Sequence, residues 1–252
     1  MNEKLALNDD ILMKIEKPAR YIGNEVNAVV KDRDSIDVRF CMCFPDVYEI
    51  GMSHLGIQIL YGMLNSWDDV WCERVYSPWV DLDEIMRKEN IPLFALESQD
   101  PIKDFDFLGI TIQYEMCYTN ILQVLDLAGI PLLATERGED CPIVIGGGPC
   151  TYNPEPIADF FDIFYIGEGE TQYRPLIDLY KKCRTEKTGR EEFLRRAAKL
   201  PGMDVPRFDE TTYHENGTIA SFRPTEEGIP ARIRKELVTD MTDSFYPMKP
   251  VG

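Results

Sequence analysis

The sequence predicts an α/β protein built on a doubly wound parallel sheet, and three observations predict it. Short apolar runs alternate with amphipathic segments along most of the chain, which is typical of strands joined by helices. The runs at 107–112 and 142–145 are almost continuously apolar, as expected for strands buried on both faces of a sheet. The connections between segments are short and carry turn residues. About five such strands predict the flavodoxin-like order 2-1-3-4-5.

The first half of this sheet is expected to contain strands at 36–44 and 70–76. Between them, Ser53 is expected to cap a helix. The apolar residues of this helix recur at the spacing of one buried face: Met52, Leu55, Ile59, Met63 and Leu64. A further helix is expected at 81–89, with Asp81 as its cap, followed by a short extended piece at 91–96.

The second half is expected to contain strands at 107–112, 142–145 and 162–166. The helix after the first of these is well marked, because Tyr118, Ile121, Leu122 and Leu125 recur at i, i+3, i+4 and i+7, and Gly129 closes it. Two more helices are expected at 170–183 and 191–199.

Different patterns flank this domain, so we divide the chain at residues 35 and 200. Residues 1–35 are predicted to form an arm that crosses the domain surface, because a proline followed closely by a glycine argues against one long helix. Residues 36–200 form the α/β domain. Residues 201–252 are predicted to form a β-hairpin, turning at Asn216-Gly217, a strand at 233–238 and a proline-containing linker toward a further domain.

The composition excludes several functional classes. The chain has 27 basic and 44 acidic side chains, a net charge of −17, so direct nucleic-acid binding is not expected. No apolar run is long enough for a membrane span, and the first ten residues are too polar for a signal peptide, which predicts a cytoplasmic protein. The seven cysteines are dispersed and are interpreted as small hydrophobic residues rather than as a metal site or disulfide framework.

The common nucleotide and nucleophile motifs are also missing. The first strand is not followed by Gly-x-Gly-x-x-Gly, and the chain contains no Walker pattern. Thr111 and Gln113 stand where a phosphoacceptor domain would place its aspartate, and no Gly-x-Ser-x-Gly elbow is present. We therefore assign no catalytic residue and no metal ligand to this chain.

The carboxyl ends of the strands are the expected binding edge, because ligands of open α/β sheets bind in the crevice there. Glycines at this edge would let a large flat ligand or another domain approach the backbone. Alternatively, the triple glycine is a tight strand exit, the Gly-Glu-Gly-Glu run is a turn with acidic residues at a helix start, and His54 is a capping residue. The candidate binding residues are Asp46, Tyr48, Gly51, Ser53, His54, Thr111, Gln113, Gly146, Gly147, Gly148, Pro149, Gly167 and Glu168.

These loops resemble those of a known family. Asp46-x-Tyr48-x-x-Gly51 resembles the Asp-x-His-x-x-Gly loop of cobalamin-binding domains, and Thr111-x-Gln113 stands where they carry Ser-x-Leu or Ser-x-Thr. The stretch from Gly146 to Glu170 resembles cobalamin-dependent radical S-adenosylmethionine enzymes. The segments 17–25 and 44–56 resemble the opening of an uncharacterised group that fuses such a domain to a radical S-adenosylmethionine core; this resemblance covers about residues 10–250.

The resemblance implies a cobalamin-binding-like accessory domain that holds a corrinoid or substrate and caps the catalytic barrel. The core, with its S-adenosylmethionine and [4Fe–4S] cluster, would lie in the same polypeptide but outside this chain, which lacks Cys-x-x-x-Cys-x-x-Cys and would not be catalytic alone. Tyr48 replaces the family's cobalt-ligating histidine, and a phenol with a pKa near ~10 is a poor ligand, so cobalamin is expected without a histidine ligand. The alternative is a degenerate, cofactor-free interaction or substrate-docking module.

Overall fold

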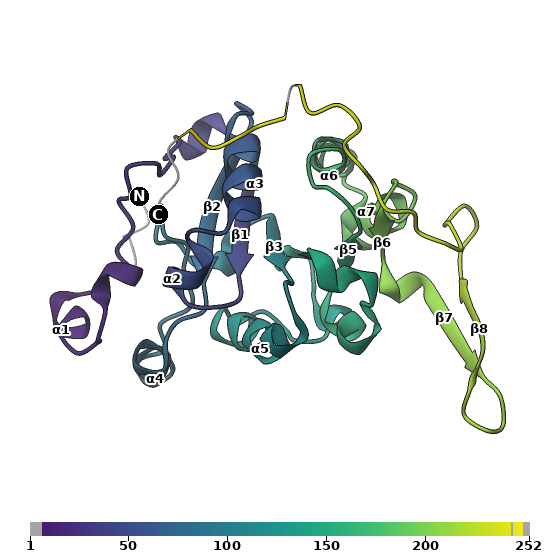
Figure 1. The fold of residues 1–252 in the computed structure, drawn as a ribbon, viewed down its shortest axis with the longest axis horizontal. Helices are drawn as coiled ribbons and strands as arrows, with labels where there is room; N and C mark the ends of the chain where they lie inside the picture. The colour runs from purple at the N-terminus through teal and green to yellow at the C-terminus, as the bar shows by residue number, and fades with distance from the viewer. Residues whose placement is uncertain (1–6, 243, 249–252) are drawn as a thin grey trace.

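A six-stranded sheet forms the centre of the molecule in the computed structural model, which describes residues 7–242 and 244–248 (Figure 1). Its order is β2-β1-β3-β4-β5-β6, and the first five strands are parallel, which confirms the predicted order 2-1-3-4-5. The short sixth strand, which the sequence pattern did not reveal, pairs antiparallel with β5. The strands are β1 (Val38–Phe44), β2 (Val70–Tyr76), β3 (Phe107–Thr111), β4 (Ile143–Gly147), β5 (Ile163–Tyr165) and β6 (Met203–Asp204).

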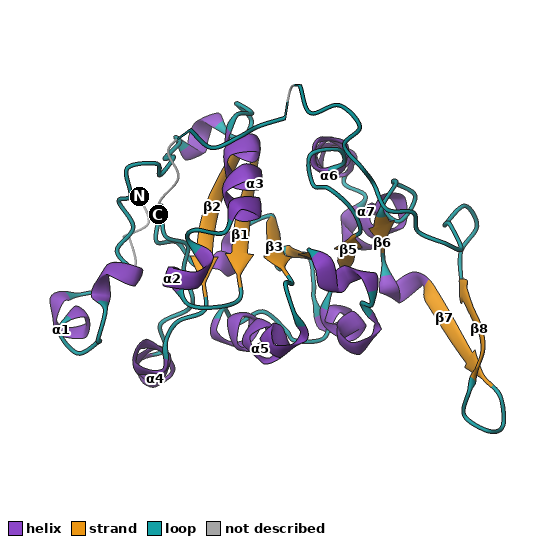
Figure 2. Cartoon of the chain, in the orientation of Figure 1, coloured by secondary structure: helices purple, strands orange, loops and turns teal. Residues whose placement is uncertain are grey.

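Helices cover both faces of the sheet, as a doubly wound fold requires (Figure 2). One face is packed by α3 (Leu55–Asn65), α6 (Tyr173–Glu186) and α7 (Gly189–Ala197), and the other by α4 (Val80–Glu89) and α5 (Tyr118–Leu127). Side chains alternate along β1, because Phe40 and Met42 join the first core while Cys41 and Cys43 join the second. The short helices α1 (Asp9–Leu12) and α2 (Tyr48–Gly51) precede α3 in the chain.

Two helix starts differ from the prediction. His54, not Ser53, is the N-cap of α3: its Nδ1 accepts a hydrogen bond from the backbone N–H of Ile57 at 3.3 Å, whereas Ser53 is exposed. The N-cap of α4 is Trp79, and Asp81 lies in the first turn, where its carboxylate accepts the backbone N–H of Glu16 at 2.7 Å. A contact with the N-terminal segment, invisible in the local pattern, therefore decides the role of Asp81.

The segments before and after the α/β region lie against it. The carbonyl oxygen of Val29 accepts a hydrogen bond from the Trp71 indole N–H at 2.9 Å. The backbone N–H of Val29 donates to the Tyr61 hydroxyl at 2.7 Å. The predicted hairpin is present as β7 (Asp209–Tyr213) and β8 (Ile219–Pro224) and projects from the body (Figure 1).

One expected extended piece and one expected strand form only isolated bridges. The piece at 91–96 forms one bridge, between Phe94 and Pro101, and the strand expected at 233–238 forms one between Gly167 and Glu236. Of the linker predicted at 244–252, residues 249–252 lie outside the described residues.

The cysteines behave as buried hydrophobic residues. Six of the seven are buried, and burial raises the pKa of Cys41, Cys43 and Cys72, which keeps these thiols protonated. Within the described residues, no helix has the length and apolar character needed to cross a lipid bilayer.

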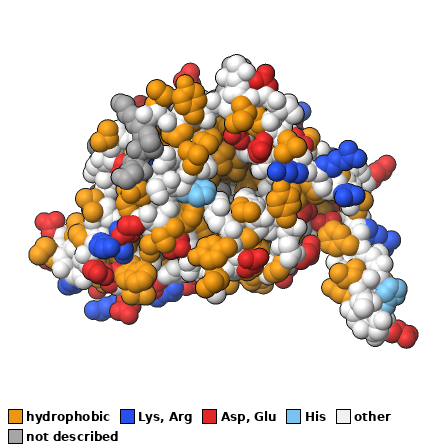
Figure 3. Space-filling view, in the orientation of Figure 1, with side chains coloured by type: hydrophobic (Ala, Val, Ile, Leu, Met, Phe, Trp, Pro, Cys, Tyr) orange, Lys and Arg blue, Asp and Glu red, His pale blue; other side chains and the backbone are white. Residues whose placement is uncertain are grey.

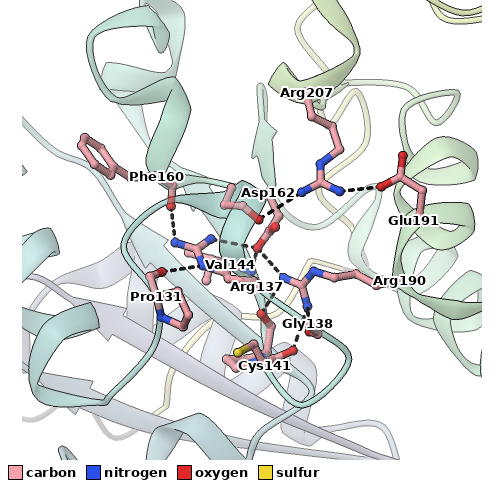
Figure 4. A network of polar contacts seen from close by, with 12 residues as sticks. Pro131, Arg137, Gly138, Cys141, Val144, Phe160, Asp162, Arg190, Glu191 and Arg207 are labelled. Atoms are coloured by element: carbon pink, nitrogen blue, oxygen red, sulfur yellow. Dashed lines mark hydrogen bonds and ion pairs between the residues drawn. The ribbon is translucent and has the colours of Figure 1, made fainter.

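A buried ion network joins elements at the amino end of β5 (Figure 4). Asp162 Oδ2 accepts hydrogen bonds from Arg137 Nη1 at 3.0 Å, from Arg190 Nη2 at 2.7 Å and from the backbone N–H of Val144 at 2.9 Å. The side chains of Asp162 and Arg137 are fully buried. The network thus ties β4, β5 and α7 together, and most of its donors and acceptors are paired within the fold; Asp162 Oδ1 and Arg190 Nε have no partner among the described residues.

Candidate functional site

A narrow slot of about 50 Å³ lies at the carboxyl edge of the sheet, between α3 and α6. Figure 3 shows the molecule hollowed at this place. The slot lies over β1, β3 and β4, where strand order reverses and doubly wound folds bind ligands. Its lining residues are Met42, Leu60, Gly109, Ile110, Thr111, Gly147, Gly148, Tyr165, Gly167, Gly169 and Tyr173.

The three consecutive glycines after β4 have different roles. A Cβ on Gly146 would lie 2.7 Å from the Phe164 ring and 3.1 Å from Ile112, so close packing explains this glycine. Gly148 has a φ of +97°, a backbone conformation that other residues rarely adopt. A Cβ on Gly147, in contrast, would have no atom within 4 Å. Packing does not explain Gly147, which leaves its backbone open to an approaching group.

The far wall of the slot is held by the C-terminal segment. Gly167 has a φ of +145°, and a Cβ there would lie 2.6 Å from the carbonyl oxygen of Glu236. The backbone N–H of Glu168 donates to the same carbonyl at 3.0 Å, and its carboxylate accepts the backbone N–H of Val238 at 2.5 Å. The slot is therefore narrow because residues 236–238 fix this loop, and a larger ligand requires the loop to move.

Polar groups at the rim come from the β3 loop and the start of α3. The Gln113 amide donates to the Thr111 hydroxyl at 2.5 Å. Burial lowers the pKa of His54, with a hydrogen bond to Gln113 opposing this, so the ring is neutral at neutral pH. Because Nδ1 of His54 accepts the capping hydrogen bond, the neutral ring carries its proton on Nε2. His54 therefore offers a donor at this edge rather than a lone pair for a metal.

Tyr48 does not line the slot. Its hydroxyl donates to the carboxylate of Glu25 in the N-terminal segment, and its ring packs edge-on against Tyr76 at 5.3 Å. Burial and Glu25 raise the pKa of Tyr48 well above that of a free phenol. Among the described residues, no group of three or more His, Cys, Asp or Glu is arranged to hold a metal. The geometry thus places neither Tyr48 nor His54 as a cobalt ligand.

The remaining predicted residues shape the loops. Asp46 Oδ1 accepts the backbone N–H of Val47 at 2.8 Å, and Gly51 packs so closely on Tyr76 that a Cβ would lie 2.5 Å from its ring. Ser53 and Pro149 are exposed. Of the thirteen predicted residues, those that line the slot are Thr111, Gly147, Gly148 and Gly167.

Sequence reasoning missed most of the apolar lining. Met42, Leu60 and Tyr173 follow the same periodic pattern as the core, so nothing in the sequence separates them from it. Gly109 did carry a signal, because a glycine inside a strand marks a close approach. Gly169 lies in the Gly-Glu-Gly-Glu run, and a Cβ there would lie 2.5 Å from Leu60 on α3.

Large apolar side chains are exposed on loops around this edge. Met116 after β3 is 81% exposed and Tyr152 after β4 is 62% exposed. Ile50 and Leu55 after β1, and Trp79 after β2, are exposed as well. Single exposed apolar residues are common, but a set shared by neighbouring loops is typical of a surface that another domain covers. We call this set the apolar rim.

Comparisons with known proteins identify the family. Residues 56–206, more than half of the chain, match the family described as "Radical SAM proteins, N-terminal". The uncharacterized protein MJ0966 of Methanocaldococcus jannaschii is 31% identical over 129 residues, which are 50% of this chain and 23% of that protein.

One solved structure is similar at a greater distance. It is the radical S-adenosylmethionine methyltransferase TsrM from Kitasatospora setae with tryptophan substrate and a SAM analog bound, at 14% identity and a TM-score of 0.40, covering 72% of this chain and 29% of that one. A likeness this distant supports no inference about function. The family match does: this chain belongs to the family of N-terminal domains of radical S-adenosylmethionine proteins.

Proposed function

We propose that this chain is an accessory domain that holds a corrinoid at its carboxyl edge and caps the catalytic core of a radical S-adenosylmethionine enzyme. The observation that carries the proposal is Gly147, whose missing side chain leaves open space in a slot at the strand-order reversal. A bound corrinoid would supply a cobalt centre that accepts and transfers an alkyl group or an electron. No residue of this chain is assigned a catalytic role.

The residues present fit a corrinoid held without a protein ligand to cobalt. Gly147 leaves backbone that a flat group approaches without meeting a side chain, and Thr111 with Gln113 offers hydrogen bonds to polar substituents. Neither a deprotonated phenol nor a free imidazole nitrogen faces the slot, as described above. Binding would displace the loop at 167–172, since a slot of about 50 Å³ is too small for a whole corrinoid nucleotide tail.

The core belongs, in this proposal, to the same polypeptide. The chain spans 23% of its archaeal relative, which leaves most of that protein for other domains. We place the S-adenosylmethionine and the [4Fe–4S] cluster in that core and keep the division at 1–35, 36–200 and 201–252. Seven free cysteines fit a reducing compartment such as the cytoplasm.

The test is retention of hydroxocobalamin by the purified chain after desalting, followed by absorbance. We expect retention by the natural sequence and by Gly138→Leu, which adds the same volume at an exposed glycine of the opposite edge. Gly147→Leu should lose at least tenfold in affinity, because its side chain fills the slot. Reduced cob(II)alamin should show no coupling to a protein nitrogen by electron paramagnetic resonance. Equal retention by both leucine variants, or no retention by the natural chain, would contradict corrinoid binding at this slot.

The apolar rim favours a second function, a cofactor-free docking module. Its exposed side chains follow β1, β2, β3 and β4 in the chain and so belong to the carboxyl edge of the sheet, as expected of a surface that another domain covers. Met116→Glu with Tyr152→Glu should then weaken association with the core segment expressed separately by about tenfold or more, while Tyr213→Glu on the hairpin should not. If these substitutions weaken association with the core segment and the natural chain retains no hydroxocobalamin, only the docking function is supported.

A further inference from the structure

A second cavity, of about 350 Å³, lies between α3, the end of β2 and the N-terminal segment. Its walls come from four segments: the N-terminal segment at Asn27, helix α3, the end of β2 at Arg74 and Tyr76, and the C-terminal segment at Phe245. It shares no lining residue with the slot described above. Its volume is at the lower end of the range for small-molecule sites.

Two polar atoms of lining residues are buried without a partner. The hydroxyl of Tyr76, a residue that is 94% buried, and Oδ1 of Asn27 have no hydrogen-bond partner among the described residues. Buried polar groups in proteins are almost always hydrogen-bonded, because an unpaired group loses its hydrogen bonds to water and gains none in the protein. Because both residues line the same cavity, a small movement of either side chain would let a bound group supply the missing partner.

The charges beside the cavity disfavour an anion. The Arg74 guanidinium donates to Glu97 Oε1 through Nε at 2.7 Å and to Glu25 Oε2 through Nη1 at 2.6 Å. Two acidic side chains therefore face one guanidinium, so its positive charge is already paired. Bringing a carboxylate or phosphate here would add like-charge repulsion in a poorly hydrated place.

The walls are aromatic and narrow. The Arg74 guanidinium stacks 4.7 Å from the centre of the Tyr61 ring. Phe245 lies so close to Gly62 that a Cβ there would be 2.1 Å from the phenyl ring. Aromatic rings in the wall of a cavity favour a flat ligand that stacks on them.

We propose that this cavity binds an uncharged, planar heteroaromatic molecule that carries N–H donors. Asn27 Oδ1 accepts one donor, and the Tyr76 hydroxyl pairs with a second polar group of the same ligand. The aromatic walls bury its ring, and the acidic side chains beside Arg74 disfavour its carboxylate analogues. The site is independent of the corrinoid proposal, because it uses different residues.

The test compares two probes of the same shape, indole-3-carboxamide and indole-3-carboxylate, by calorimetry on the purified chain. We expect the amide to bind and the carboxylate to bind at least tenfold more weakly. Tyr76→Phe, which removes one oxygen, should weaken the amide about three- to tenfold. Phe245→Ala should weaken it further by opening the wall, and Tyr213→Phe, on the hairpin, should leave it unchanged.

Each other outcome overturns the proposal. Absence of amide binding at millimolar concentration means that the cavity holds only water. Equal binding of the two probes removes the proposed ligand class. Unchanged binding in Tyr76→Phe and Phe245→Ala, with circular dichroism showing intact folds, places the probe elsewhere.

Discussion

The two edges of the sheet use their polar residues in opposite ways. At the amino edge, Asp162 is buried against Arg137 and Arg190, and almost every donor of the two guanidinium groups is used within the fold. At the carboxyl edge, Gly147 faces open space and Gln113 and His54 are only half-buried. Structure accounts for the first set of residues, whereas the second set has room for something that binds.

This difference separates stability from function in the same domain. Changes at the amino edge should act on unfolding and leave binding alone, and changes at Gly147 should do the reverse. The variants below test that separation, in order of expected effect.

The largest effect is expected from Asp162→Ala. Removing the carboxylate leaves two buried guanidinium groups without their shared partner, which typically lowers the free energy of unfolding by about 3–5 kcal/mol. Chemical denaturation measures it. Asp178→Ala is the control, since this carboxylate forms a half-exposed ion pair on α6 and should change stability by less than about 1 kcal/mol. Similar losses in both variants would contradict the structural role of the amino edge.

Gly146→Ala and Gly147→Ala should have different effects on stability, because the first glycine is closely packed and the second faces open space. The methyl group at 146 would enter the space of the buried Phe164 ring, and such overpacking costs about 1–3 kcal/mol. The methyl group at 147 would touch nothing, so its effect on unfolding should stay within about 0.5 kcal/mol. Thermal or urea unfolding of both variants gives the comparison. A strongly destabilised Gly147→Ala would mean that this glycine is structural and would weaken the case for the slot.

A smaller, pH-dependent effect is expected at Asp204 on β6. Unlike Asp162, this carboxyl group has carboxylates for neighbours, and burial together with Asp209 raises its pKa to about 7. The folded protein then holds a proton that the unfolded chain releases above about pH 4, so stability should fall as pH rises from about 4 to about 7. Asp204→Asn should flatten this decline and add about 1–2 kcal/mol at pH 8.

Urea unfolding of the natural chain and Asp204→Asn at several pH values measures this difference. Asp178→Asn, which changes an exposed carboxyl group, should retain the slope. A natural chain whose stability rises through this window by more than the Asn variant would show that Asp204 is ionised when folded.

The strand order was predictable because each element carries its own periodic pattern. Continuous apolar runs mark β3 and β4, and the spacing from Tyr118 to Leu125 marks α5, so the parallel order followed from general rules of connection. Strand β6 was not predicted, because a strand of two residues is too short to show a periodic pattern. The predicted capping roles of Ser53 and Asp81 were wrong. A local pattern does not reveal the short helix α2, which precedes α3, or the contact between Asp81 and Glu16.

The candidate site was only partly predictable. Glycine is visible in a sequence, so Gly147, Gly148 and Gly167 were found, but which of them faces open space depends on neighbours distant in the chain. Tyr48 stands in the motif position of a cobalt ligand, yet Glu25 and Tyr76 hold it outside the slot. The sequence by itself determined the sheet, the edge at which binding is expected and the family resemblance, because these depend on local spacing. Only the tertiary structure decided which groups remain free at that edge, because hydrogen bonds and packing between distant segments use up the others.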